Sequence, residues 1–210
     1  MPFAARIREL GTVEYADTYR RMREFTDARD HSTADEIWLL EHPGVYTLGT
    51  NADEDHVIDA GDTAIVRTDR GGQVTWHGPG QLVVYVLLDL KRSGLGIREL
   101  VCLLEQAIIE LLEQYGIAAG GREGAPGVYC DGAKIASVGL RIRRNRSYHG
   151  IAINVSNELA PFAGINPCGY EGLDVTRVCD QGGPADIGRV ATDLLPLLLR
   201  RLALEPLEAD

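Results

Sequence analysis

The sequence lacks an apolar stretch long enough to cross a membrane. Its longest apolar runs, residues 82–88 and residues 194–199, fall far short of the ~20 residues that a membrane-spanning helix needs. The first ten residues, MPFAARIREL, carry charges where a secretory signal requires an apolar run. We therefore expect a cytoplasmic protein that has no membrane partner.

Positive charge is scarce as well. The chain has 21 Lys and Arg residues against 31 Asp and Glu residues, which gives a formal net charge of -10 at pH 7. This balance disfavours non-specific attraction to the phosphates of nucleic acid or of an anionic membrane. We expect no nucleic-acid partner, and we expect protein partners to be recognised by local patches.

The four cysteines do not have the spacing of a disulfide framework or of a zinc site. They lie at positions 102, 130, 168 and 179, and the sequence contains neither a CxxC pair nor an HExxH motif. Reduced thiols in a cytosolic protein fit this pattern best. The sequence therefore predicts no metal site.

Nucleotide-binding and serine-hydrolase motifs are also missing. Residues 127–134 read GVYCDGAK, which resembles a phosphate-binding loop until Ala133 displaces the required Gly-Lys pair, and no Ser or Thr follows Lys134. Residues 135–139 read IASVG, which lacks the first glycine of a nucleophile elbow. The sequence thus supports neither ATP use nor any other cofactor.

The 210 residues, 45% of them hydrophobic, suffice to bury the core of a single domain. Apolar residues recur with helical spacing in some segments and alternate in others, which predicts mixed α and β structure. In the first half of the chain we expect a helix over 13–28 with Thr12 as its N-cap, strands over 36–40 and 45–48 around a turn, and strands over 64–68 and 81–89. A core helix follows over 97–115, with Gly116 as its C-cap. We then expect β-structure over 128–155 with a hairpin turn at 145–147, an ordered loop over 161–183, and closing helices over 186–204 that are kinked or begin near Pro196.

The densest unusual segment is RGGQVTWHGPGQ, residues 70–81, which places four glycines between two predicted strands. Glycine lets the backbone approach a ligand closely or adopt a positive φ. An ordinary tight connection between strands explains such a cluster equally well. Arg70, Thr75 and His77 in the same segment favour a binding site.

Cys168 differs from the other cysteines in its surroundings. It lies in INPCGY, between a proline and a glycine, in a predicted loop where a thiol is accessible for reaction. The positions of Cys102 in the helical pattern and of Cys130 at the end of an apolar strand predict core packing. Cys179 stays undecided, and Cys168 is the candidate nucleophile.

A nucleophilic thiolate needs a nearby base or cation, and Lys134, His77 and His149 are the candidates. A lysine at the end of a strand is usually a solvated edge charge. A histidine beside a turn is usually a hydrogen-bonded structural residue. Taken singly, each of the three therefore favours a structural role.

Four segments, RGGQVTWHGPGQLVVY, GAKIASVGLRIRR, YHGIAINV and INPCG, stand in an order and spacing that carry a family signature. Together they resemble the octanoyl-acyl carrier protein:protein octanoyltransferase family of lipoate biosynthesis. The similarity extends upstream to LGTVEY and LLEHPGVYTLG, so it covers about residues 10–180. One departure is Arg177, where the family commonly has a serine.

This resemblance implies an α+β fold shared with the biotin and lipoate protein ligases, a mixed β-sheet flanked by helices, with a small C-terminal lobe. Residues 1–210 would form a single octanoyltransferase catalytic domain. Cys168 would carry the acyl group as a thioester. Lys134 would lower the pKa of the Cys168 thiol and shuttle protons. The implied substrate-binding residues are Arg70, Gly71, Gly72, Gln73, Val74, Thr75, Trp76, His77, Ser137, Val138, Gly139, Gly150, Ile151 and Ala152.

The resemblance also implies the partners. The donor would be octanoyl-acyl carrier protein, and the acceptors would be the lipoyl domains of 2-oxoacid dehydrogenases and the H protein of glycine cleavage. A thioester donor agrees with the missing ATP motif, because amide formation from a thioester is downhill. The hairpin pattern agrees too, since Gly139, Gly150 and Ala152 share one face and leave room for a slender alkyl chain.

Two other functions stay open at this point. An ATP-dependent lipoate or biotin ligase would share the fold, form an acyl-adenylate and need no cysteine. A non-catalytic acyl-carrier-binding protein would need neither an acyl-adenylate nor a reactive cysteine.

Four arginines at positions 141, 143, 144 and 146 form the densest cluster of positive charge. A solvated hairpin end is the simpler interpretation of this cluster. The alternative hypothesis is that it steers an acidic carrier protein to the site.

Overall fold

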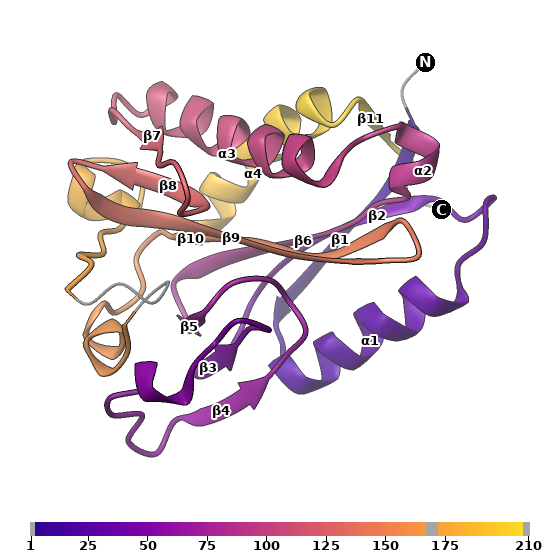
Figure 1. The fold of residues 1–210 in the computed structure, drawn as a ribbon. Helices are drawn as coiled ribbons and strands as arrows, with labels where there is room; N and C mark the ends of the chain where they lie inside the picture. The colour runs from indigo at the N-terminus through magenta and orange to yellow at the C-terminus, as the bar shows by residue number, and fades with distance from the viewer. Residues whose placement is uncertain (1–2, 167–171, 208–210) are drawn as a thin grey trace.

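The computed structural model describes residues 3–166 and 172–207 of the chain. Within them, a mixed eight-stranded sheet forms the middle of the molecule (Figure 1). Its strands, in spatial order, are β11 (Leu204–Pro206), β1 (Phe3–Thr12), β2 (Asp35–Glu41), β6 (Gln81–Leu87), β10 (Arg146–Asn154), β9 (Ala133–Arg143), β8 (Gly127–Cys130) and β7 (Gly120–Gly121). β1 is parallel to both of its neighbours, and the other pairs are antiparallel.

Helices cover both faces of this sheet (Figure 1). One face carries α3 (Ile97–Gln114) and α4 (Ile187–Arg201). The other carries α1 (Tyr15–Ala28) and a second sheet with the strand order β4 (Ala64–Arg67), β3 (Val45–Leu48), β5 (Val74–His77). Short helical segments complete the fold: α2 (Leu90–Ser93), η1 (Glu54–His56), η2 (Ala160–Gly164) and η4 (Val178–Gln181). The expected mixed sheet with flanking helices is confirmed.

Strand β6 explains why the main sheet is buried on both faces. Successive side chains of a strand point to opposite faces, and every residue of β6 is apolar except Gln81. Val84 and Val86 belong to the cluster under α3 and α4, whereas Val83 and Tyr85 belong to the cluster under α1. A strand with apolar residues on both faces belongs inside a covered sheet.

The predicted core helix is α3. Leu100, Leu104 and Ile108 are fully buried at a spacing of four residues, and Gly116, with a φ of 75°, follows the helix end as predicted. Cys102 lies on the exposed side of α3, so the core packing predicted for it is wrong. Two residues beyond Leu100 turn the side chain about 200° around the helix. Cys130 is buried, as predicted.

The N-terminal part differs from the sequence-based prediction. Residues 3–12 form β1, whose pairing with a strand about 30 residues later leaves no local signal. Thr12 is the last residue of β1, and the N-cap of α1 is Glu14, so the predicted cap is wrong. The strands predicted around His42 exist, but β2 belongs to the main sheet and β3 to the small one.

The C-terminal part consists of one helix and one edge strand. Asp186 caps α4, because its carboxylate accepts a hydrogen bond from the Arg189 backbone N–H at 3.0 Å. Pro196 lies inside α4 and does not mark the start of a helix, and Leu194 and Leu198 on either side of it are fully buried. Packing therefore keeps the helix continuous past the proline. β11 then pairs with β1.

β9 and β10 form the predicted hairpin. The turn residues are Arg144 and Asn145, which have φ values of 52° and 60°. Two consecutive positive φ values are the signature of the tight two-residue turns that match the twist of a hairpin. The turn lies slightly earlier than the predicted 145–147.

Gly150 of β10 allows two strands to approach each other, and this makes a testable prediction. A Cβ atom at position 150 would collide with the backbone carbonyl of Val84 on β6. We expect Gly150→Ala to lower the free energy of unfolding by about 1–3 kcal/mol, the usual range for overpacking. Gly120→Ala is the matched control, because a Cβ there meets nothing within 4 Å. Urea denaturation of both variants measures the difference, and equal stabilities would contradict the explanation.

Candidate functional site

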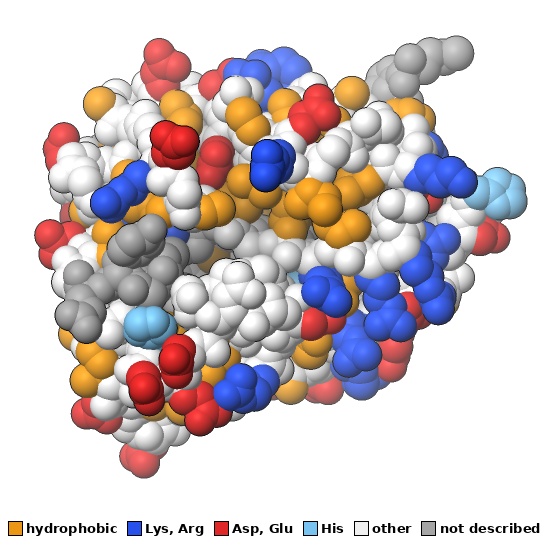
Figure 2. Space-filling view, in the orientation of Figure 1, with side chains coloured by type: hydrophobic (Ala, Val, Ile, Leu, Met, Phe, Trp, Pro, Cys, Tyr) orange, Lys and Arg blue, Asp and Glu red, His pale blue; other side chains and the backbone are white. Residues whose placement is uncertain are grey.

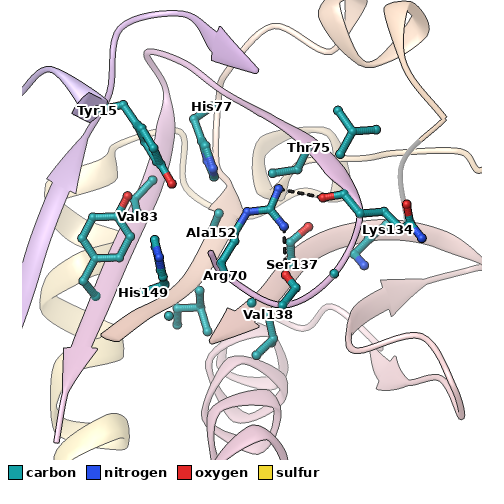
Figure 3. Close-up of a pocket in the computed structure, with 18 residues that line it drawn as sticks. Tyr15, Arg70, Thr75, His77, Val83, Lys134, Ser137, Val138, His149 and Ala152 are labelled. Atoms are coloured by element: carbon teal, nitrogen blue, oxygen red, sulfur yellow. Dashed lines mark hydrogen bonds between the residues drawn. The ribbon is translucent and has the colours of Figure 1, made fainter. Parts of the chain in front are cut away.

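A pocket lies between the α1 side of the main sheet and the glycine-rich segment that leads into β5 (Figure 3). Residues of β6, β9 and β10 form its floor, and residues 70–75 form its roof. Its empty space is about 530 Å³, counted out to the open mouth. The walls are mostly apolar, as in sites that bind small organic groups.

Small side chains make the floor of the pocket. In the hairpin register Ser137 pairs with Ala152 and Gly139 pairs with Gly150, so these four positions are adjacent. A Cβ at Gly139 would lie 3.3 Å from the carbonyl oxygen of Gly71, which means that the roof lies directly above it. The small face predicted from the sequence is therefore part of the pocket.

Arg70 holds the roof in place. Its guanidinium is buried and donates hydrogen bonds to the carbonyl oxygens of Thr47 at 2.6 Å, of Gln73 at 2.8 Å and of Gly71 at 3.0 Å. The backbone N–H of Gly71 donates to the carbonyl oxygen of Leu140 at 2.8 Å. These bonds fasten the roof to β3 on one side and to β9 on the other.

Two buried histidines lie together near the pocket: His77 lines it, and His42 packs against His77. His77 is bonded through Nδ1 to Gln81 Oε1 at 2.7 Å, and burial lowers its pKa to about 3. His42 contacts the carbonyl oxygen of Val13 and the hydroxyl of Tyr85, both at 2.7 Å, and burial lowers its pKa to about 4. Both rings are therefore neutral at pH 7.

His149 lines the pocket in a strained backbone conformation. Its φ is 61°, which is unfavourable for a residue with a side chain. Its ring lies 3.3 Å from Asp69 through Nε2 and stacks on Tyr148 and Tyr19. Burial lowers the pKa of His149, and the bond to Asp69 raises it less. These contacts offset the strain and fix the ring.

Lys134 lies at the other side of the pocket from His149 and Tyr15 (Figure 3). Its side chain is 97% buried, and Nζ donates to the carbonyl oxygen of Pro126 at 2.9 Å and to the hydroxyl of Tyr129 at 3.3 Å. A Cβ at Gly127 would come within 2.9 Å of Nζ, so the missing side chain there makes room for the ammonium. The solvated edge charge that is usual for a lysine at a strand end does not apply.

Cys168 lies outside the described residues. The segments before and after it are tied to the fold by backbone contacts. Asn166 donates its N–H to the carbonyl oxygen of His56 at 2.9 Å. Val175 forms a parallel bridge with Lys134, through bonds of 2.8 and 2.9 Å on its two sides.

Comparison with known proteins places this pocket in a family. Residues 14–196 match the lipoyl protein ligase A/B catalytic domain family. The chain is 55% identical to an octanoyltransferase of Methylococcus capsulatus over 97% of this chain and 98% of that one, and 56% identical to one of Aromatoleum aromaticum over 93% and 85%. This chain belongs to the octanoyltransferase family. It is an enzyme, and its reaction is an acyl transfer.

Solved structures of more distant proteins have the same fold. A putative lipoate protein ligase from T. acidophilum superposes with a TM-score of 0.78 at 15% identity, over 98% of this chain and 88% of that one. A biotin protein ligase from Aquifex aeolicus superposes with a TM-score of 0.58 at 15% identity, over 96% and 69%. The fold expected for an octanoyltransferase is thereby confirmed.

The structure brings together nearly all of the residues that the sequence suggested. The pocket is lined by every predicted substrate-binding residue except Trp76, and also by Lys134 and His149. The indole of Trp76 is buried against the ring of Phe162, 5.7 Å away, in the core of the small sheet. Alternation along β5 explains this difference, because Thr75 and His77 face the pocket and the residue between them points away.

Three residues of the pocket lining were not predicted: Tyr15, Val83 and Tyr85. Val83 and Tyr85 alternate along β6 on the α1 side, a pattern that predicts burial but not a pocket. Tyr15 begins α1, far from the glycine-rich segment in sequence. Only the packing of α1 against the sheet brings it to the pocket.

The arginine cluster lies at the end of β9 that is remote from Lys134. Arg143 is nine residues along the strand from Lys134, or about 30 Å. It pairs with Asp27 at 2.9 Å, and Arg146 donates to the carbonyl oxygen of Thr26 at 3.1 Å. Figure 2 shows Lys and Arg side chains gathered on this side of the molecule, near α1. The cluster thus lies far from Lys134 along β9, and the contacts of Arg143 and Arg146 fit a hairpin end.

Arg177, the departure from the family pattern, has a structural role. It donates to the carbonyl oxygens of Ser156 at 3.2 Å and of Asn157 at 2.8 Å, and it pairs with Asp180 at 2.9 Å. It thus fastens the segment before η4 to the residues after β10.

Membrane-spanning helices are long and apolar. Among the helices of the described residues, none combines the length and the apolar character that a span needs.

The buried neutral histidines predict how stability depends on pH. Unfolding exposes His42 and His77 and returns their pKa values to about 6.5, so the unfolded chain binds more protons below that pH. The contribution of these histidines to the free energy of unfolding is therefore complete above pH 6.5. It falls as the pH drops towards 4, by up to about 1.4 kcal/mol per pH unit for each histidine.

Urea denaturation of the wild-type enzyme and of His42→Gln between pH 7.5 and 4.5 measures this slope. We expect His42→Gln to reduce it. His31→Gln is the control, because His31 is exposed and its loss should leave the slope unchanged. Equal slopes in all three proteins would rule out His42 as a cause.

Proposed function

We propose that this octanoyltransferase moves an octanoyl group from acyl carrier protein to a lysine of lipoyl-domain proteins in the cytoplasm, through a thioester on Cys168. The acceptors are the lipoyl domains of 2-oxoacid dehydrogenases and the H protein of glycine cleavage. One observation carries the proposal: a narrow, mostly apolar pocket has a buried lysine at one side, and the chain that follows Cys168 pairs with that lysine's backbone.

The first half-reaction makes the acyl-enzyme. The Cys168 thiolate attacks the carbonyl carbon of the carrier thioester, the carrier C–S bond breaks, and the Lys134 ammonium gives its proton to the leaving thiolate. A buried ammonium suits this task, because a nearby cation stabilises a thiolate more strongly where water is excluded. The products are octanoyl-Cys168 and the free carrier thiol.

The second half-reaction makes the amide. The acceptor lysine's amine attacks the thioester carbonyl, the C–S bond to Cys168 breaks, and neutral Lys134 takes a proton from the amine nitrogen. The carbonyl oxygen of Pro126 and the hydroxyl of Tyr129 hold Nζ in place for both steps. Lys134 returns to its ammonium form and Cys168 to its thiolate.

The pocket suits a medium-length alkyl chain. Burial of a methylene is worth ~0.8 kcal/mol, so the tail of an octanoyl group would gain roughly 5 kcal/mol from full burial. Ser137, Gly139 and Ala152 leave the floor free of bulky side chains. The neutral rings of His77 and His149 add polar edges without adding charge beside the chain.

The rival function is that of an ATP-dependent ligase. It draws support from the structural likeness to lipoate-protein ligase A bound with ATP, at a TM-score of 0.77. That likeness has 15% sequence identity, whereas the octanoyltransferase relatives exceed 50%. A ligase would also need ATP and no cysteine, so omission of ATP separates the two functions.

The deciding experiment incubates the enzyme with octanoyl-acyl carrier protein without ATP, followed by intact-mass measurement and peptide mapping. We expect one octanoyl group on Cys168, which then passes to an added lipoyl domain. An adduct that requires ATP would support the ligase. Binding of the carrier without an adduct or transfer would support a non-catalytic binding protein.

Replacement of each cysteine tests the nucleophile. We expect Cys168→Ser to lose both adduct formation and transfer. Cys102→Ser, Cys130→Ser and Cys179→Ser should retain most of both, because none of these three lines the pocket. Transfer rates measured by mass spectrometry of the lipoyl domain give the comparison. Full turnover by Cys168→Ser would reject the mechanism.

Replacement of Lys134 tests the proton shuttle. We expect Lys134→Ala to slow transfer at least ~100-fold, the usual scale for loss of a general acid and base. Iodoacetamide labelling of Cys168 should also shift to higher pH, since the nearby cation is lost. The matched control is Lys91→Ala, because the chain has only these two lysines and Lys91 is exposed on α2. An unchanged labelling profile would make Lys134 a structural residue.

A further inference from the structure

Tyr15 is an unpredicted residue at one end of the pocket. It is the first residue of α1, it is 97% buried, and the rest of its helix contributes nothing to the lining. Figure 3 shows Tyr15 and Lys134 on opposite sides of the pocket, with Arg70 and Ala152 between them. A chain whose carbonyl group lies beside Lys134 therefore extends towards Tyr15.

The ring of Tyr15 is held by aromatic neighbours on several sides. It stacks on His77 with ring centroids 5.9 Å apart and on Tyr19 at 6.2 Å, and it meets His42 edge to face at 5.1 Å. His77 and His42 are themselves bonded, to Gln81 and to the carbonyl oxygen of Val13. A ring packed against fixed rings cannot move aside without displacing them, because protein interiors are close-packed.

Packing, and not hydrogen bonding, fixes this ring. The Tyr15 hydroxyl is buried, and no hydrogen bond of good geometry to it occurs among the described residues. A side-chain contact with Thr68 lowers the pKa of Tyr15, but burial outweighs this effect and raises the pKa to about 12. The hydroxyl thus stays protonated, and its removal should leave the packing of the ring unchanged.

We propose that the ring of Tyr15 is the end wall of the acyl pocket and sets the length of the chain that the enzyme accepts. This inference rests on the proposed function, because it takes the octanoyl group as the occupant of the pocket. Up to the wall, each buried methylene improves binding about fourfold. Beyond the wall, a further methylene must displace a packed ring, which costs more than it gains.

The test measures kcat/KM with hexanoyl, octanoyl, decanoyl and dodecanoyl carrier protein and a lipoyl domain as acceptor. We expect the wild-type enzyme to prefer octanoyl. Tyr15→Leu removes the ring and should move the optimum to decanoyl or dodecanoyl, with the ratio of decanoyl to octanoyl rising roughly 15-fold for its two additional methylenes. The change should fall mainly on KM, because the reacting groups are untouched.

Two matched variants separate the wall from general damage to α1. Tyr15→Phe keeps the ring and removes only the hydroxyl, so its chain-length profile should equal that of the wild type. Phe25→Leu makes the same change further along α1, at a residue that packs against the sheet but does not line the pocket. It should keep the octanoyl optimum. A folded Tyr15→Leu with the wild-type ratios would overturn the proposal.

A third variant decides the matter if Tyr15→Leu fails to fold. Val83→Ile adds a methyl group to the lining on the side of the pocket where Tyr15 lies (Figure 3). It should shift the optimum towards hexanoyl, and unchanged ratios would place the end of the chain elsewhere and overturn the proposal. Should the wild type transfer no chain at all, the proposed function fails. Calorimetric binding of hexanoate to dodecanoate then tests the wall by itself.

Discussion

The buried guanidinium of Arg70 is the interaction on which the pocket depends. The roof of the pocket is a glycine-rich segment with few side chains of its own to pack, and its carbonyl oxygens need donors. Arg70 supplies them, with bonds to the backbones of Thr47, Gln73 and Gly71. Because a guanidinium presents its donors in a rigid plane, these bonds fix the position of the roof as well as stabilise it. The floor, in contrast, is set by strand pairing that would exist without the roof.

The regular elements could be predicted from sequence where one residue period dominates. β6 and α3 have unambiguous patterns, and the hairpin of β9 and β10 follows from alternation on both sides of a short polar segment. β1 could not be predicted in this way, because its partner strand lies beyond a helix and many of its residues are exposed. A helix start near Pro196, one of the two alternatives expected there, was wrong because the rule against proline inside a helix considers the backbone alone, while α4 is held by leucines packed under it.

The parts of the site that could be predicted are those formed by residues contiguous in sequence. The glycine-rich segment and the two hairpin strands carry their own signature, and they line the pocket together. Tyr15 carries no such signature. Its place depends on how α1 crosses the sheet, which is a property of the tertiary fold. Trp76 shows the reverse case, because a signature segment can contain a residue that faces the core of the protein.

Lysine is rare in this chain. Only Lys91 and Lys134 occur, and the other 19 of the 21 basic side chains are arginines, which stay protonated and make poor nucleophiles at neutral pH. Lys134 is buried with its ammonium bonded to Pro126 and Tyr129, and Lys91 lies on α2 beside the hairpin turn, at the other end of β9. This octanoyltransferase therefore presents few amines of its own, so its surface is poorly suited to accidental acylation by neighbouring copies.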